Sequence, residues 1–147
     1  MADIKVVSRD AGQTVLLHDN GDGSYTPYTA LTGGTTTKDV IVANGAAGLS
    51  AEVDLEGYTL AAIQMPATWV AANITFQAAT ASGGTFQDVY DDSDLEVTVV
   101  AVQGHCVTVD AAALKLGALR HIKLRSGTAA APVNQTADRT LTLILKR

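Results

Sequence analysis

The sequence predicts an all-β protein, an antiparallel β-sandwich of immunoglobulin-like or jelly-roll-like form with an N-terminal hairpin or arm. Short apolar runs rich in Val, Ile and Thr recur along the chain, and Gly, Asn, Asp and Pro separate them, which is the pattern of strands and turns. Several runs alternate apolar and polar residues, as 139–147 does, which indicates one buried face. Only 111–119 has the composition of a helix, and Gly117 interrupts it, so we expect one or two turns at most.

The composition indicates how the core is built. The chain has 147 residues, which suits a single compact domain. Hydrophobic residues make up 47% of it but aromatic residues only 5%, so Ala, Val, Leu and Ile must form most of the core.

The first strands lie at the N-terminus. The runs IKVVS (4–8) and TVLLH (14–18) are predicted to be strands joined around 9–13. The run SYTPY (24–28) also alternates, but Pro27 lacks an N–H group and therefore belongs on a sheet edge or in an arm.

The segment HDNGDGSYTPY (18–28) admits two interpretations. A calcium-binding EF-hand loop needs oxygen ligands at alternate positions and a glutamate at the twelfth position. Counted from Asp19, the third and fifth positions are glycines and the twelfth is Ala30, so this pattern fails. The Asn-Gly and Asp-Gly pairs at 20–21 and 22–23 instead favour a hairpin turn, because they adopt positive φ at low cost.

The Gly/Thr-rich segment 33–37 is typical of a linker. We therefore expect an arm or β-hairpin over residues 1–37 and the β-sandwich over residues 38–147. The strands expected in the sandwich are 39–43, 51–55, 58–65, 73–80, 85–91, 95–102, 106–110, 121–126 and 139–147.

An acidic cluster extends from the end of the fifth of these strands to the start of the sixth. It consists of Asp88, Asp91, Asp92, Asp94 and Glu96. Carboxylate oxygens suit a hard cation such as calcium or magnesium. Asp and Ser are also the residues of solvated turns, and we favour the turn because like charges packed closely without a partner stay exposed.

Neither the histidines nor the cysteine predict a metal site. His18, His105 and His121 lack the spacing of zinc ligands. Cys106, the only cysteine, excludes an intrachain disulfide. Because it lies in the apolar run CVTVD, we expect it to be a buried, unreactive thiol.

The sequence predicts neither an enzyme nor a cofactor. It contains no GxSxG nucleophile motif, and GGTTTK (33–38) lacks the phosphate-loop frame. Ser82-Gly83-Gly84 is expected to be a turn between strands. Trp69 is interpreted as a core residue or subunit contact, with a ligand-stacking platform as the alternative.

The charge balance disfavours nucleic acid as a partner. Ten Lys+Arg stand against fifteen Asp+Glu, whereas duplex binding needs a basic stripe. A local patch of Arg120, Lys123 and Arg125 is the exception to consider. No apolar run approaches ~20 residues, and MADIKVVSRD (1–10) has no apolar signal core, so we expect neither membrane insertion nor secretion.

Two blocks carry a resemblance to a known family. Residues 61–99 contain IQMP-x-x-W, TFQ and TF-x-D-x-YD, and residues 119–146 contain KLRSGT-x-x-x-PV-x-Q and a terminal strand. Together they resemble a family of small structural proteins encoded by tailed bacteriophages and prophages. The N-terminal LLHDNGDGSYTPY (16–28) is similar to a DNGDGTY hairpin of phage virion proteins.

The resemblance implies a virion component and brings no catalytic residues. We expect a capsid decoration, or cement, protein that docks on the assembled head, with a tail, neck or baseplate component as the alternative. Expected partners are copies of itself, as a trimer, and the major capsid protein or another virion protein, at the capsid surface after synthesis in the bacterial cytoplasm. The expected contact residues are Val6, Val7, Leu16, Leu17, Tyr25 and Tyr28 in the arm, and Arg125, Pro132 and Gln135 in the later loop.

A carbohydrate-binding module for host attachment is a further alternative. It predicts that Trp69 is exposed near acidic or amide side chains such as Gln64, Asn73 or Asp91.

Overall fold

The computed structural model describes residues 4–9, 13–19, 25–28, 34–45 and 47–147, and for the first three ranges it describes the backbone. The chain divides into two compact units, Met1–Gly33 and Gly34–Arg147.

The first unit contains a three-stranded antiparallel sheet in the order β1-β2-β3. Its strands are β1 (Ile4–Arg9), β2 (Gln13–Asp19) and β3 (Tyr25–Tyr28). The edge position predicted from Pro27 is confirmed, because β3 ends the sheet. The register places Val6 opposite Leu16 and Leu16 opposite Tyr28. The predicted turn at 20–23 lies outside the described residues.

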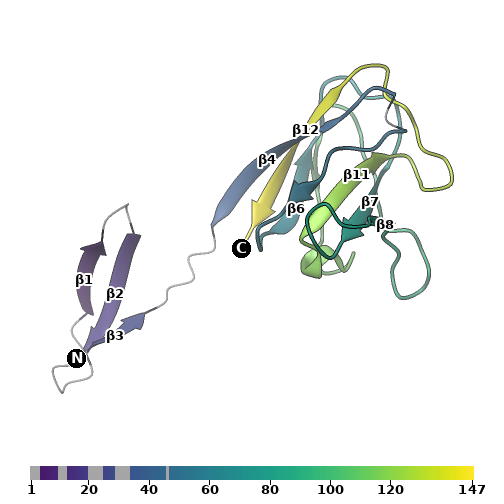
Figure 1. Ribbon diagram of the computed structural model, residues 1–147. Coiled ribbons are helices and arrows are strands. Elements are labelled where there is room, and N and C mark those ends of the chain that lie inside the picture. Colours follow the sequence, from purple (N-terminus) through teal and green to yellow (C-terminus); the bar gives the residue numbers. More distant parts are fainter. Residues whose placement is uncertain (1–3, 10–12, 20–24, 29–33, 46) are drawn as a thin grey trace. The chain divides into compact units, whose positions relative to one another are not determined.

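The second unit is a β-sandwich of two packed antiparallel sheets, which confirms the predicted fold class (Figure 1). The four-stranded sheet has the order β10-β6-β12-β4, and the five-stranded sheet has the order β5-β11-β7-β8 with β9 also paired to β7. The strands of the four-stranded sheet are β4 (Thr35–Val42), β6 (Thr59–Gln64), β10 (Cys106–Thr108) and β12 (Arg139–Lys146). Those of the five-stranded sheet are β5 (Val53–Asp54), β7 (Ile74–Ala79), β8 (Gln87–Asp88), β9 (Thr98–Val99) and β11 (His121–Ser126).

The core lies between the two sheets and is mostly aliphatic, as the composition predicts. Alternate residues of β12 (Leu141, Leu143 and Leu145) are fully buried. Phe76 of β7 is also fully buried. Burial of each such side chain stabilises the fold by about 1.5–3 kcal/mol, so the period-two pattern fixes which face of each strand points inward.

The segment 85–102, predicted to hold two full strands, is instead one interrupted strand. β8 pairs with the C-terminal half of β7 and β9 pairs with its N-terminal end, on the same edge. Between them, 89–97 leaves the sheet as a small hairpin: the Val97 N–H group donates to the Val89 carbonyl at 3.0 Å, and Tyr90 bridges Glu96.

The predicted linker ends earlier than expected. Residues 35–37 belong to β4, where Thr35, Thr36 and Thr37 pair with Lys146, Leu145 and Ile144. Small polar residues are typical of linkers, but β-branched threonines also fit an extended strand.

The single helix candidate forms turns over 111–115 followed by a short 3₁₀ helix, η1 (Leu116–Ala118). Leu116 anchors it by packing into the core. This agrees with the expectation of one or two turns.

Candidate interaction surface

The expected contact residue Arg125 is buried inside the sandwich unit. Its guanidinium forms ion pairs with Asp88 of β8 and with Glu96, whose Oε1 lies 3.3 Å from Nη1. The hydrogen bond from Arg125 is the main cause that lowers the pKa of Asp88, and a 3.0 Å bond from Gln77 adds to it. The prediction that Arg125 contacts a partner is wrong, because the 89–97 hairpin covers its side chain.

Gln135 is likewise buried, with no exposed surface. Its Oε1 accepts a hydrogen bond from the Val70 N–H group at 2.7 Å, and its Nε2 donates to the Val70 carbonyl at 3.1 Å and to Oγ of Ser126 at 2.7 Å. The amide therefore attaches the loop before β12 to the loop after Trp69. Its predicted role as a partner contact is wrong for this reason, whereas Pro132 of the same loop is exposed.

Trp69 packs in the core and is 7% exposed. Its Nε1–H group donates to the Ala72 carbonyl at 3.0 Å, which satisfies the only polar atom of the ring. The core interpretation is confirmed, and the exposed stacking platform required by a carbohydrate-binding module is contradicted.

Asp91, Asp92 and Asp94 of the acidic cluster form the predicted turn at the tip of the 89–97 hairpin, whereas Asp88 and Glu96 pair with Arg125 instead of remaining unpartnered. Oδ1 of Asp91 accepts the N–H groups of Ser93 and Leu95 at 2.8 and 2.9 Å, and these bonds lower the pKa of Asp91. Asp94 has a φ of 60°, and Asp92 pairs with Lys115. Within the described residues, no group of three His, Cys, Asp or Glu side chains is placed to hold a metal ion.

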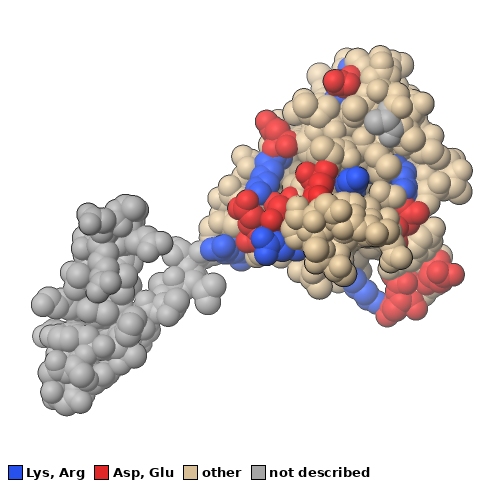
Figure 2. All heavy atoms as spheres, in the orientation of Figure 1, with Lys and Arg blue, Asp and Glu red and all other residues tan. Residues whose placement is uncertain are grey.

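The possible basic patch is not a free surface of positive charge. Arg120 pairs with Asp54 at 2.9 Å, and Nζ of Lys123 lies 4.4 Å from the centre of the Phe86 ring. Arg125 is buried as described above. Figure 2 shows blue and red side chains lying next to each other over the described part of the visible face.

The outer face of the five-stranded sheet is covered by loops of the same chain. β11 points His121, Lys123 and Arg125 outward, yet two of the three are buried. Nδ1 of His121 lies 2.9 Å from Oε1 of Glu52, and Glu52 also accepts the Gly83 N–H group at 2.9 Å. That backbone hydrogen bond is the main cause that lowers the pKa of Glu52.

The outer face of the four-stranded sheet has no such cover from loops of the second unit, and we name it the open face. Cross-strand pairing places thirteen side chains on it: Thr35, Thr37, Asp39, Ile41, Thr59, Ala62, Gln64, Cys106, Thr108, Thr140, Thr142, Ile144 and Lys146. Of these, only Ala62 is buried.

The open face is nearly uncharged. Asp39 and Lys146 are its only residues with a formal charge, and Asp39 accepts a hydrogen bond from Oγ1 of Thr142 at 2.6 Å. Cys106 lies on this face and is exposed, so the predicted buried thiol is wrong. The neighbours of Cys106 in the sequence are apolar, so the sequence alone does not reveal that its side chain points outward, opposite Gln64.

Four exposed apolar side chains lie close together in the sequence, on and after the 89–97 hairpin. Tyr90 and Leu95 lie on the hairpin, and Val100 and Val102 lie between β9 and β10. Leu95 is 64% exposed and Val100 is 68% exposed, which is high for side chains of this type. We name these four residues the apolar segment.

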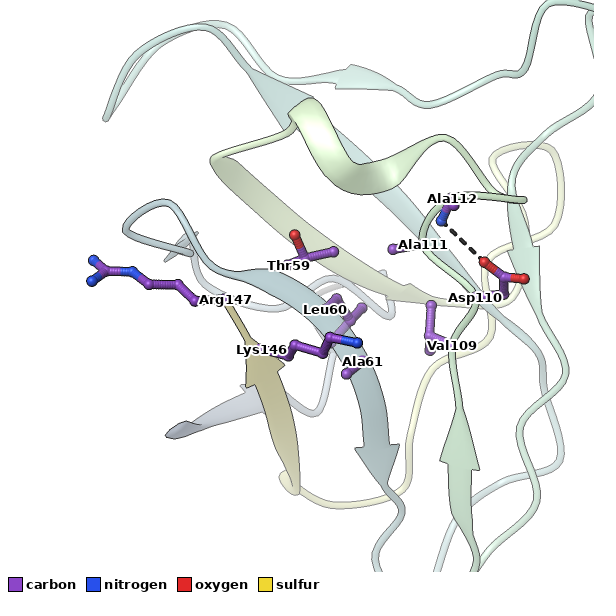
Figure 3. Close-up of a pocket in the computed structure, with 9 residues that line it drawn as sticks. All are labelled: Thr59, Leu60, Ala61, Val109, Asp110, Ala111, Ala112, Lys146 and Arg147. Carbon is purple, nitrogen blue, oxygen red and sulfur yellow. Dashed lines mark hydrogen bonds between the residues drawn. The ribbon is translucent and has the colours of Figure 1, made fainter. Parts of the chain in front are cut away.

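A shallow pocket of about 290 Å³ lies beside the start of β6 (Figure 3). Asp110 on its wall accepts the Ala112 N–H group at 3.1 Å, so its carboxylate stabilises a turn. Arg147 points away from the other labelled side chains in Figure 3 and stacks 4.5 Å from the Tyr58 ring centre. The side chains of Asp110 and Arg147 therefore both have partners within the fold.

The six expected contact residues of the arm (Val6, Val7, Leu16, Leu17, Tyr25 and Tyr28) lie in β1, β2 and β3. Their side chains are outside the described part of the structure. In the described part of the chain, no helix has both the length and the apolar character needed to span a membrane.

No protein-family model, curated protein or solved structure matches this chain.

Proposed function

We propose that this protein is a non-enzymatic structural component of a tailed-phage virion, and specifically a capsid decoration protein that docks on the assembled head. The proposal starts from the resemblance carried by the blocks 61–99 and 119–146. It is supported by the places that the motif residues take in the sandwich.

The observation that carries the proposal is that these motifs join to each other inside the fold. Arg125 of KLRSGT pairs with Asp88 of TF-x-D-x-YD. Gln135 of PV-x-Q bonds to Val70, directly after the W of IQMP-x-x-W, and to Ser126 of KLRSGT. The matching residues therefore specify a way of building this sandwich, and its outer surfaces are left for contacts with other proteins.

The surface chemistry supports protein contacts. The open face and the apolar segment consist mainly of Thr, Ile, Val and Leu side chains, which lose little rotamer entropy when a partner covers them. We assign the apolar segment to contact with the shell, because desolvation of exposed Leu95 and Val100 stabilises an interface.

The mechanism of stabilisation is mass action. A protein that binds the assembled shell and not its separated subunits stabilises the shell, by about 2.7 kcal/mol per site at a concentration 100 times Kd. Many such sites on one head would oppose the pressure of packaged DNA.

The test is binding to purified phage heads that lack this protein. We expect saturable binding, counted from sedimented protein, with one copy or a fixed small number per capsid subunit, and heads that survive heating better. The variant with Leu95→Asp and Val100→Asp should lose binding. Ala81→Asp, which adds charge at another exposed position, should keep it.

Two results would contradict the proposal. Absence of binding to heads together with binding to isolated tails would move the protein to the tail, neck or baseplate. Equal binding by the Leu95/Val100 variant would show that the apolar segment is not the docking surface.

A further inference from the structure

We propose that the open face of the four-stranded sheet is the surface through which two copies of this chain associate, related by a two-fold axis. This inference stands apart from the proposed role in a virion, because it concerns the purified protein alone. It would replace the trimer expected from the sequence with pairs.

The first step is the difference between the two outer faces of one sandwich. The face of the five-stranded sheet carries Arg125 and His121, and the chain's own loops bury both with carboxylate partners. The face of the four-stranded sheet carries threonines, Ile41 and Ile144, and no loop of the second unit covers it. Only two of its thirteen side chains carry a formal charge and two are isoleucines, so a partner could cover this face with little cost of burying charge.

The second step is that the charges of the open face suit a copy of itself. Its one acid, Asp39, lies on β4, and its one base, Lys146, lies at the end of β12. A two-fold contact brings the same surface together twice, so an Asp39–Lys146 contact would form in both directions. The face has no net charge and therefore no like-charge repulsion against its own copy.

The third step compares the area of the open face with the area that a stable dimer buries. Strands lie about 4.8 Å apart and rise about 3.4 Å per residue, so the four strands present roughly 400 Å² of flat area per copy. This is below the roughly 800 Å² per partner of a standard stable interface. We therefore expect pairs that dissociate in the micromolar to millimolar range when free. If many copies are bound side by side on a phage head, their effective concentration is higher and a larger fraction of them would pair.

Cys106 provides a direct reporter of this pairing. It is the only cysteine of the chain, and it lies on the open face with its thiol exposed. Sedimentation equilibrium from about 10 μM to about 1 mM, a span that brackets weak association, would give the mass. The rate at which Ellman's reagent modifies the thiol would be measured over the same range. We expect the mass to rise from monomer to dimer and the thiol rate to fall with the same midpoint.

Two sets of variants separate this face from other surfaces. Thr37→Arg places a bulky charge on β4, the edge strand of the open face that also carries Asp39, and should weaken dimerisation at least tenfold. Thr80→Arg makes the same change at an exposed position beyond β7 and should leave it unaltered. Asp39→Lys should also weaken dimerisation, and Lys146→Asp added to it should restore pairing if these two residues meet. Circular dichroism melting would verify that each variant folds.

A protein that stays monomeric at all concentrations with an unchanged Cys106 rate would overturn the inference. So would a trimer, or a dimer equally sensitive to Thr80→Arg. Failure of head binding would not affect it, because no heads are present in these measurements.

Discussion

Arg120, just before β11, and Arg125, near its end, each pair with an aspartate but in very different surroundings. The Arg120 side chain is 62% exposed beside Asp54, whereas the Arg125 side chain is 7% exposed between Asp88 and Glu96. Water screens the first pair, so it contributes little to stability. The 89–97 hairpin shields the ion pairs of Arg125 with Asp88 and Glu96 from water. Removing one of these side chains would therefore leave a partly buried charge without its partner.

Arg125→Met should therefore destabilise the protein by about 3 kcal/mol, because it leaves two partly buried carboxylates without a counter-charge. The value lies at the lower end of the range for broken buried pairs, since the Asp88 side chain is still partly exposed to water. Arg120→Met is the matched control and should change stability much less. Chemical denaturation followed by the fluorescence of the single tryptophan would measure both, and equal losses would contradict this view.

Acid should weaken the fold through its carboxylates. The pKa of Asp88 is lowered mainly by Arg125, so this group contributes stability above the unfolded pKa, about 3.9, and the contribution is lost as pH falls through the lower folded pKa. Asp91 and Glu52 act in the same direction. The free energy of unfolding should be flat from pH 7 to about 5 and decline below about pH 4.

Asp88→Asn should make this acid decline shallower, because it removes one of the titrating groups. Denaturation curves at a series of pH values for both proteins would show the difference. Parallel curves down to pH 2.5, a pH at which ordinary carboxyl groups are protonated (about 3.9 for Asp), would mean that Asp88 has an ordinary pKa in the folded protein.

At the scale of elements, the loop between β4 and β5 depends on two glycines with the same backbone angle and different surroundings. Gly45 has a φ of 76° and Gly48 a φ of 72°. A Cβ atom on Gly45 would meet no atom within 4 Å, whereas one on Gly48 would lie 2.7 Å from the Ser126 carbonyl oxygen and 2.8 Å from that of Val133. Gly48 thus lets this loop approach β11 and the loop that follows it.

Gly45→Ala should cost about 1 kcal/mol, the expense of a positive φ for a residue with a side chain. Gly48→Ala carries the same φ cost and adds a clash with backbone atoms, so it should cost about 1–3 kcal/mol more. Thermal unfolding of the two variants would isolate the clash. Similar melting temperatures would show that the loop moves away without penalty.

Sequence reasoning located the long strands well and the interrupted one poorly. The strict alternation of 139–147 marks β12, because Leu141, Leu143 and Leu145 must share one face. In 85–102 the sequence correctly predicts two strands, but β8 and β9 pair with β7 over only two residues each. The 89–97 hairpin between them covers Arg125, which lies 29 residues after Glu96 and 37 after Asp88, so no local pattern encodes that partner.

For the candidate surface, the residue type alone does not show whether a side chain is exposed. Arg125 and Gln135 are polar and were therefore expected to be contacts, although both are buried. Cys106 was expected to be buried because its neighbours are apolar. The open face becomes visible only when the register aligns β4, β12, β6 and β10, since its residues come from four distant parts of the chain.

At the scale of the whole molecule, the second unit should fold without the first. It contains its own core, and the Arg147 N–H group donates to the Gly34 carbonyl at 3.0 Å, which joins the two ends of this unit. A chain limited to residues 34–147 should therefore melt at the same temperature as the corresponding transition of the full chain. Scanning calorimetry of both would measure this, and a large fall would mean that the first unit stabilises the second.

The interrupted strand lets the chain become longer at one place without disturbing the sheets. β8 and β9 hold β7 independently on either side of the 89–97 hairpin, and the Val97–Val89 hydrogen bond closes its base. Residues added at its tip, around 92–94, would leave the register of every strand as it is. We therefore expect the tip to accept inserted residues, so that foreign peptides could be displayed there on an unchanged scaffold.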